Sequence, residues 1–272
     1  MSVTNINQFR DFVDDTPDRV WKVIFTVLPF LVIGTLWETL SGTLISARLL
    51  PPLSGVLAGM VELWTTDSRI QPYIGITIFR GLAGVTISTF IGVPVGILTA
   101  RYDFFDKNVS PMLNAFFPIP KSPMIPLVVF WLGIGNLSRV VLAIISSLIP
   151  ITLSSISAAK NVDQNLIWSA RSMGVSETQV LYKVILPASL PTILSGIRIG
   201  TIFSFITIIS SEMIIARDGI GVLVTQFASQ GRYELFFASV LYIVIIVGLI
   251  NRLFLVLSNR MITWSEEGVS GI

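Results

Sequence analysis

Long runs of apolar residues, separated by short polar stretches, dominate the pattern of this chain of 272 residues. A helix needs about 20 mostly apolar residues to cross the hydrocarbon core of a bilayer. On that criterion the pattern predicts about six spans, near 22–41, 80–100, 111–133, 139–158, 192–215 and 235–257. The expected fold class is therefore an all-α membrane protein.

Two helices are also predicted outside the spans. Thr16 followed by Pro17 is typical of an N-cap with proline at the first helical position, so residues 1–21 are expected to form a short amphipathic lead-in. A second helix is expected after Pro52, in the long loop that follows the first span. It is expected to lie at the membrane interface, because its apolar residues recur at helical spacing and include a tryptophan: Val56, Leu57, Met60, Val61 and Trp64.

Composition supports a membrane location and excludes several kinds of chemistry. Only 12% of the residues are charged, about half the fraction of a soluble domain. The chain has no cysteine and no histidine, which excludes disulfides, thiolate metal sites and a histidine general base. No Gly-Lys pair occurs, so the chain lacks a P-loop for ATP. The net charge of +2 gives no reason to expect nucleic-acid binding.

The charged residues predict how the spans are oriented. Six spans place both termini on one side, and the segments on that side hold more lysines and arginines than the loops opposite. Cytoplasmic loops of membrane proteins carry such an excess, so we expect both termini in the cytoplasm. The first 20 residues are acidic, unlike the basic start of a cleaved signal peptide, and are expected to stay in the mature chain.

A polar, amphipathic stretch separates the fourth and fifth spans. Gly174 is expected to divide it into two short helices, because glycine readily takes the left-handed conformation that ends a helix. Ser176 and Gln179 have the spacing of a capping box for the second helix, which Leu186 and Pro187 are expected to end. Such a unit rests on its own bundle, docks into a groove on a partner or lies among lipid headgroups. Its apolar face holds Val180, Leu181, Val184 and Ile185.

The order of residues in this stretch resembles the EAA loop of ATP-binding cassette (ABC) importer permeases. A small pair, a glycine after three residues, and an aliphatic-x-Leu-Pro ending after nine more are found at Ser169-Ala170, Gly174 and Val184 to Pro187. Residues 50–257 as a whole are similar to the permeases for nitrate, sulfonates, taurine, bicarbonate and pyrimidine precursors. The other matching segments are Leu50-Pro51-Pro52, Phe117-Pro118-Ile119-Pro120, Ile125-Pro126-Leu127, Trp131-Leu132-Gly133-Ile134-Gly135, Ala188 to Gly200, and Ser211-Glu212-Met213 ahead of Gly219-Ile220-Gly221.

The resemblance implies a fold and a set of partners. It implies the type I ABC importer (MetI-like) permease fold, with a transmembrane permease domain at 22–258, cytoplasmic coupling helices at 160–187 and a cytoplasmic tail at 259–272. The implied partners are two ABC ATPase subunits that bind ATP and Mg²⁺, a second permease copy, expected as a homodimer, and an extracytoplasmic solute-binding protein. This chain itself is expected to hold no cofactor and no metal. The implied location is the prokaryotic cytoplasmic (inner) membrane.

In that family the loop docks into a cleft of the ATPase, which implies an ATPase-coupling role for the matching residues here. One departure is that Trp168 stands where the family has a glutamate before the small pair. An acidic contact is lost there, and the aromatic becomes a candidate anchor, because aromatics often fill interface pockets. The implied coupling residues are Trp168, Ser169, Ala170, Gly174, Val180, Leu181, Val184, Leu186 and Pro187.

Polar residues within the spans indicate either a translocation pathway or close helix packing. Ionised groups inside a bilayer are rare, so Glu212 is expected near the outer end of span five, as a gate or paired with a basic residue. Lys121 is expected to line the cavity or to snorkel, and it is the candidate contact for an anionic substrate. Small hydroxyls form stripes that line a pore or let helices pack closely. The pathway candidates are Lys121, Ser147, Ser154, Thr201, Ser204, Thr207, Ser211 and Glu212.

Two other functions fit a polytopic chain. A secondary transporter driven by an ion gradient would need no ATPase, and would usually hold more intramembrane carboxylates than Glu212 alone. An intramembrane enzyme is disfavoured because the chain lacks histidine, cysteine and any dense acidic cluster. Co-purification with a P-loop protein would separate these alternatives from an importer permease.

Overall fold

The computed structural model describes residues 18–262, and within them the chain is almost entirely helical. This confirms the expected all-α fold class. The amphipathic lead-in expected over residues 1–21 and the tail at 259–272 lie mostly outside the described residues. The helices are α2 (Asp18–Leu40), α3 (Leu53–Thr66), α4 (Ile70–Arg101), α5 (Asp103–Phe116), α6 (Met124–Leu132), α7 (Asn136–Lys160), α8 (Gln164–Ser172), α9 (Glu177–Val180), the π-helix η1 (Leu181–Ile185), α10 (Leu186–Ile214), α11 (Ile220–Ser229) and α12 (Tyr233–Met261).

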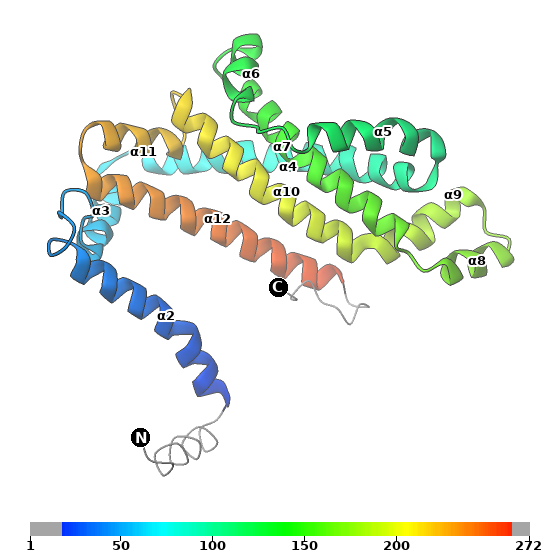
Figure 1. The fold of residues 1–272 in the computed structure, drawn as a ribbon, viewed down its shortest axis with the longest axis horizontal. Coiled ribbons are helices and arrows are strands. Elements are labelled where there is room, and N and C mark those ends of the chain that lie inside the picture. Colours follow the sequence, from blue (N-terminus) through cyan, green and yellow to red (C-terminus); the bar gives the residue numbers. More distant parts are fainter. Residues whose placement is uncertain (1–17, 263–272) are drawn as a thin grey trace.

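Four stretches of the described chain are long and apolar enough to cross a membrane: α4, α7, the continuous helix Glu177–Ile214, and α12. Figure 1 shows them running alongside one another, with α8 and α9 at one end of the bundle and α3 and α11 at the opposite end, here called the far end. The expected span at 22–41 corresponds to α2, whose apolar part Val27–Leu40 is shorter. α4 begins at Ile70, ten residues before the expected span at 80–100.

The single span predicted over 111–133 is wrong. Helix α5 ends at Phe116 and α6 begins at Met124, and three prolines fall in or beside the gap. Proline cannot donate a backbone hydrogen bond and clashes with the preceding helical turn. The Nζ of Lys121 donates to the carbonyl oxygens of Phe116, Phe117 and Ile119 at 3.1, 2.9 and 2.7 Å, which satisfies carbonyls that the ending helix leaves free.

The centre of the bundle is formed by α4, α7 and α10, which approach closely through small residues. A Cβ on Gly84 would lie 2.3 Å from the Cβ of Ala143, and a Cβ on Gly196 would lie 2.2 Å from that of Ser154. These contacts are shorter than side chains allow, so glycine is what lets the backbones meet, as is common between membrane helices. The hydroxyls of Ser88 and Ser147 add a 2.8 Å hydrogen bond between α4 and α7.

The far end has its own apolar cluster, formed by α3, α11, α12 and the start of α4. The helix predicted after Pro52 is confirmed as α3, and the Trp64 ring on it stacks on Tyr242 of α12 with the ring centroids 6.2 Å apart. By contrast, α2 diverges from the bundle (Figure 1) and leaves large apolar side chains exposed, among them Phe30 and Leu31. The most apolar window of α12 has no buried residue. Both surfaces suit contact with lipid or with another membrane subunit.

Candidate functional site

The two short helices α8 and α9 project beyond the ends of α7 and α10 (Figure 1). Asp163 caps α8 by accepting a hydrogen bond from the backbone N–H of Asn165 at 2.9 Å. Gly174 ends the helix with a φ of +76°. The N–H of Gly174 donates to the carbonyl of Arg171, and the N–H of Val175 donates to that of Ala170. This pair of bonds is the Schellman motif of a left-handed helix end, so the expected break at Gly174 is confirmed.

The capping box predicted for the second helix is also confirmed. The backbone N–H of Gln179 donates to the Ser176 hydroxyl, and the backbone N–H of Ser176 donates to the Gln179 side chain. The two bonds satisfy N–H groups that a helix start leaves without partners. The loop between α7 and α10 therefore has a fixed start, break and restart.

The expected end of this helix at Leu186-Pro187 is wrong. The chain passes from α9 through one π-helical turn, η1, directly into α10, and forms a continuous helix from Glu177 to Ile214. Pro187 falls at the start of α10, where it cannot donate to the preceding turn. The wider π turn absorbs that missing bond without stopping the helix.

One face of the loop is buried against the bundle. Val180 is 1% exposed and Ile185 2% exposed, and both belong to one buried apolar cluster with Ala159 of α7 and Ile193 of α10. Of the predicted coupling residues, Ala170 is also buried in this cluster, and Leu181 and Val184 are partly buried beside it. The alternative in which the loop rests on its own bundle is therefore correct for this face.

Several large apolar side chains elsewhere on the loop are exposed, among charged and polar ones. Trp168 is 59% exposed and Met173 76% exposed, and Leu166 and Tyr182 are also exposed. Ser169, next to Trp168, is exposed as well, whereas Pro187 is partly buried at the helix junction. Exposed apolar side chains on a polar loop are the usual mark of a surface that meets a partner.

An exposed ion pair connects α8 to α9. Arg171 contacts Glu177 through Nε to Oε1 at 2.8 Å and Nη2 to Oε2 at 2.9 Å, a two-point geometry suited to a guanidinium and a carboxylate. The hydrogen bond from Arg171 lowers the pKa of Glu177, and the same bond raises the pKa of Arg171. Arg171 precedes Gly174 and Glu177 follows it, so the ion pair bridges the break between the two helices.

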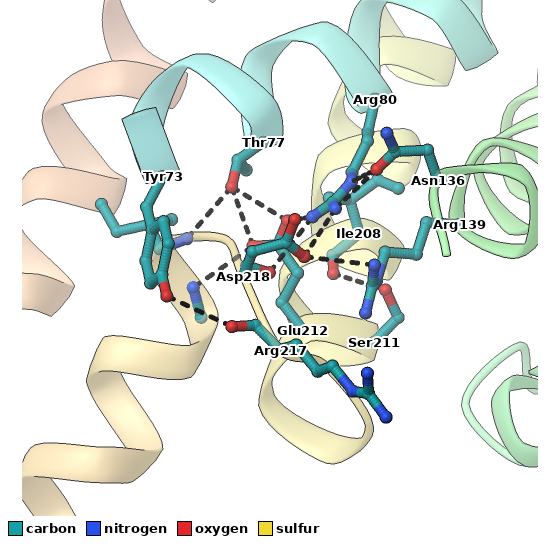
Figure 2. A network of polar contacts seen from close by, with 12 residues as sticks. Tyr73, Thr77, Arg80, Asn136, Arg139, Ile208, Ser211, Glu212, Arg217 and Asp218 are labelled. Carbon is teal, nitrogen blue, oxygen red and sulfur yellow. Dashed lines mark hydrogen bonds and ion pairs between the residues drawn. The ribbon is translucent and has the colours of Figure 1, made fainter. Parts of the chain in front are cut away.

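A second candidate site lies at the far end of the bundle, where polar and charged side chains gather among the helices (Figure 2). We call it the far-end polar cluster. Arg80, Glu212 and Arg139 are 0, 1 and 2% exposed, which is unusual for charged residues. The members of the cluster are Thr77, Arg80, Asn136, Arg139, Glu212 and Asp218.

Arg80, on α4, is at the centre of this cluster. Its Nη1 contacts Oε1 of Glu212 at 2.8 Å and its Nη2 contacts Oδ1 of Asp218 at 2.7 Å. Its Nε and Nη2 both donate to Oδ1 of Asn136, at 2.9 and 2.7 Å, and its Nη1 also donates to the backbone carbonyl of Asp218 at 3.2 Å. All five N–H groups of the guanidinium thus have an acceptor. The expectation that Glu212 pairs with a basic residue is met by Arg80.

The glycines near Glu212 make room for its side chain. Gly219 has a φ of +110°, and a Cβ there would lie 2.1 Å from the Glu212 carboxyl carbon. A Cβ on Gly221 would lie 2.8 Å from the Cβ of Glu212, and the N–H of Gly221 donates to the carboxylate at 3.2 Å. The Thr77 hydroxyl lies 2.8 Å from the same carboxylate oxygen. The spacing of Ser211-Glu212-Met213 and Gly219-Ile220-Gly221 therefore has a steric cause.

The hydroxyls predicted to line a pathway are mostly buried within this one chain. Ser204 donates to the carbonyl of Gly81 at 3.0 Å, and Thr207 lies 2.7 Å from the Ser146 hydroxyl. This burial agrees with the packing alternative for most of the stripe. The residues concerned are Ser147, Thr201, Ser204, Thr207 and Ser211, whereas Ser154 is partly buried against Gly196.

Lys121 and Thr207 meet at a cavity. It has a volume of about 220 Å³ and lies between the α5–α6 turn and α10, with Phe117, Phe203 and Ser210 also in its lining. The ammonium of Lys121 is already bonded to three carbonyls. Its role as the contact for an anionic substrate stays a prediction.

Sequence reasoning missed most partners of Glu212. Spans expected to begin at 80 and 139 place Arg80 and Arg139 at the membrane edge, where a charge needs no partner within the bundle. In the structure α4 begins at Ile70, so Arg80 is almost three turns inside the helix. The signal that could have found it was the same as for Glu212, an ionisable residue within an apolar run.

Comparison with known proteins finds permeases of ABC transporters. Over 251 residues, 90% of this chain and 91% of the relative, the chain is 29% identical to the taurine transport system permease protein TauC of Escherichia coli. It is 24% identical to the putative aliphatic sulfonates transport permease protein SsuC of Bacillus subtilis (89% of this chain, 88% of the relative). It is 23% identical to the formylaminopyrimidine transport permease protein ThiX of Halalkalibacterium halodurans (92% and 99%).

The fold also matches a solved structure. A chain of the MetNI methionine ABC transporter, in an inward-facing conformation, superposes with a TM-score of 0.61 at 22% identity, over 74% of this chain and 98% of that one. The alternatives of a secondary transporter and an intramembrane enzyme find no counterpart among these relatives. The family model of the binding-protein-dependent transport system inner membrane component matches residues 92–263. The chain therefore belongs to that family, and it is the multi-pass inner-membrane permease component of an ABC importer rather than its ATPase.

Proposed function

We propose that two copies of this permease pair as a homodimer with two ATPase subunits that bind ATP and Mg²⁺, and with one extracytoplasmic solute-binding protein. The family name supports a binding-protein partner, and the absence of a Gly-Lys pair supports a separate nucleotide-binding subunit. The exposed apolar surfaces of α2 and α12 support contact with a second membrane subunit. The permease then converts ATP hydrolysis on one side of the membrane into solute passage through it.

The loop between α7 and α10, here called the coupling loop, is the proposed contact with the ATPase. The observation that carries this proposal is the division of the loop into a buried face, with Val180 and Ile185, and an uncovered face around Trp168. Trp168 and Ser169 would contact the ATPase directly. The proposed role of Ala170, Val180, Leu181 and Val184 is to seat the loop on the bundle, and that of Leu186 and Pro187 is to join it to α10.

The orientation follows from this contact. If the coupling loop meets an ATPase, the ends of α4, α7 and α12 near it face the cytoplasm, and the far end faces outward. Helix α2 runs toward the far end, whereas α12 ends on the side of the loop, so both termini are proposed to be cytoplasmic. The positive charges of Arg101, Lys160, Arg171 and Lys183 at the loop end support this sidedness.

The proposed substrate is a small anionic or polar solute, of the class that includes nitrate, sulfonates, taurine, bicarbonate and vitamin precursors. The names of the relatives support it, since they carry taurine, aliphatic sulfonates and formylaminopyrimidine. The cavity beside Lys121 and Thr207 is the part of the proposed pathway that a small solute fits within one chain.

Single cysteines test the proposal cleanly, because the parent chain has none. Ser176→Cys and Glu177→Cys should react with impermeant thiol reagents from the cytoplasmic side only, and bound ATPase should protect both. Phe130→Cys, on the exposed surface of α6, is the matched control that the ATPase should leave unprotected. Labelling of the loop from outside would overturn the orientation, and labelling unaffected by the ATPase would overturn the contact.

A further inference from the structure

One unbroken helix connects the coupling loop to the far-end polar cluster. It begins at Glu177 in α9, passes through η1, and ends at Ile214, two residues beyond Glu212. At 1.5 Å per residue, 38 residues span about 57 Å. A displacement of α9 is therefore transmitted along a stiff element rather than through a flexible loop.

The far end of this helix is anchored to three other elements by charged and polar bonds. Glu212 binds Arg80 and Thr77 of α4 and the backbone of Gly221 at the start of α11. Through Arg80 it is also linked to Asn136, the first residue of α7. Figure 2 shows the side chains of Glu212, Asp218 and Asn136 pointing toward the Arg80 guanidinium.

The Arg80–Glu212 contact is built to persist. Both side chains are fully buried, and every N–H of Arg80 has an acceptor. Separating a buried ion pair leaves an uncompensated charge in a medium of low dielectric constant. Glycines at 219 and 221 fit around the carboxylate so closely that no Cβ is accommodated.

The periphery of the cluster is less tightly bound. Asp218 has a side chain that is 43% exposed, and its contact with Arg139 is 3.3 Å long. The Nε of Arg139 is buried and has no hydrogen-bond partner. The Asp218–Arg139 contact is therefore the longest ion pair of the cluster, whereas Arg80 contacts Glu212 and Asp218 at 2.8 and 2.7 Å.

We propose that Arg80 and Glu212 are positioning residues that anchor the far end of the α9–η1–α10 helix. They make the ends of α4, α7, α10 and α11 move as one block when the coupling loop is displaced. Access at the far end then changes when the blocks of the two permease copies move relative to one another. Within each block, α10 does not separate from α4. This inference rests on the proposed coupling of the loop to an ATPase, and it adds the part that delivers the motion.

The test is the number of solute molecules taken up per ATP hydrolysed, in proteoliposomes that contain the full complex. Glu212→Gln keeps the shape of the side chain and removes its charge, so this ratio should fall by about tenfold, within the usual range for a lost coupling. Glu62→Gln is the matched control, since the Glu62–Arg232 pair also lies at the far end but is half-exposed. Its ratio should equal that of the parent.

A second variant covers the case in which Glu212→Gln does not fold. Thr77→Val removes the hydroxyl that donates to the carboxylate and accepts from the backbone N–H of Ile220, and it keeps the ion pair, so it should lower the ratio less, in the same direction. A lower yield of permease with an unchanged ratio in these variants would show that the cluster only stabilises the fold. If the parent itself fails to couple uptake to ATP hydrolysis, the proposed function fails instead.

Spin labels test whether the block stays intact. Phe79 of α4 and Met213 of α10 are exposed neighbours of Arg80 and Glu212, and cysteines there would be the only ones in the chain. In complexes with one labelled copy, the distance between the labels should be the same in the nucleotide-free and ATP-bound states. A change of that distance on ATP binding would mean that α10 parts from α4, and would overturn the inference.

Discussion

Gly174 links the two helices of the coupling loop, and its replacement by valine should uncouple solute uptake from ATP hydrolysis. Its backbone has a φ of +76°, and a Cβ placed on it would meet nothing within 4 Å. The effect of a side chain at this position is therefore backbone strain alone. Lack of space for a side chain, the other physical reason for a glycine, does not apply at Gly174, because the space around it is open.

The size of the effect follows from that strain. A left-handed conformation costs an L-residue about 1–2 kcal/mol, and a β-branched residue is more strongly disfavoured. That cost is small beside the stability of a folded domain, about 5–15 kcal/mol, so the permease should still insert and fold. The strain is relieved by breaking the two Schellman bonds at Gly174 and Val175. Since about 1.4 kcal/mol is a factor of ten, the docking orientation should be about 5- to 30-fold less populated.

The assay is ATP-driven uptake in proteoliposomes, with ATP hydrolysis measured in parallel. Gly174→Asn should retain most of the uptake, because asparagine tolerates the left-handed region better than other residues. Gly133→Val is the matched control, since Gly133 also has a positive φ of +78° and open space for a Cβ, but lies outside the loop. Parent-like uptake by Gly174→Val, or equal losses in the valine and asparagine variants, would refute the reasoning.

Trp168→Ala should weaken ATPase binding by at least about 2 kcal/mol, or roughly 30-fold, in a titration of detergent-solubilised permease. Parent-like affinity would show that the exposed ring is no anchor. Tighter binding by Trp168→Glu would show that the partner prefers an acidic contact. Gly196→Leu should lower the free energy of unfolding by about 1–3 kcal/mol, and with it the melting temperature, because the new Cβ would overlap Ser154. An unchanged melting temperature would mean that α7 and α10 separate freely. The hydrogen bond from Arg171 lowers the pKa of Glu177. The contribution of this ion pair to loop order should therefore be full above the ordinary glutamate range near pH 4, and be lost as pH falls through the lowered pKa. A Glu177→Gln variant with the same thiol-labelling profile against pH would contradict this.

Local features of the coupling loop could be predicted from the sequence because their causes are local. The capping box needs only Ser176 and Gln179 at the right spacing, and the Schellman end needs only Gly174 after a helix. The uninterrupted passage into α10 could not be predicted in the same way. A Leu-Pro pair usually ends a helix, whereas here Ile185, in the π turn, is buried in a cluster that includes Ala158 and Ala159 of α7.

The spans were predictable from hydropathy where nothing but apolar length decided them. α7 and α12 agree with the expected 139–158 and 235–257 to within a few residues at most ends. The expected span at 111–133 failed because a hydropathy window counts apolar side chains and ignores backbone breaks. Pro118, Pro120 and Pro123 were visible in the sequence, but the bonds that stabilise the break come from Lys121.

The far-end polar cluster shows why the two ends of this protein differ in predictability. Glu212 and Arg80 are 132 residues apart in sequence, and nothing local to either predicts the other. What the sequence did contain was a pattern around Glu212, with Gly219 and Gly221 at fixed distances. The structure turns that pattern into a requirement, because each glycine is in contact with the Glu212 side chain. A glutamate that needs two glycines to be buried, and an arginine with all its donors used, stabilise one geometry and oppose any other. The end proposed to contact the ATPase is exposed and depends on local sequence, whereas the far end depends on contacts between helices that are distant in sequence.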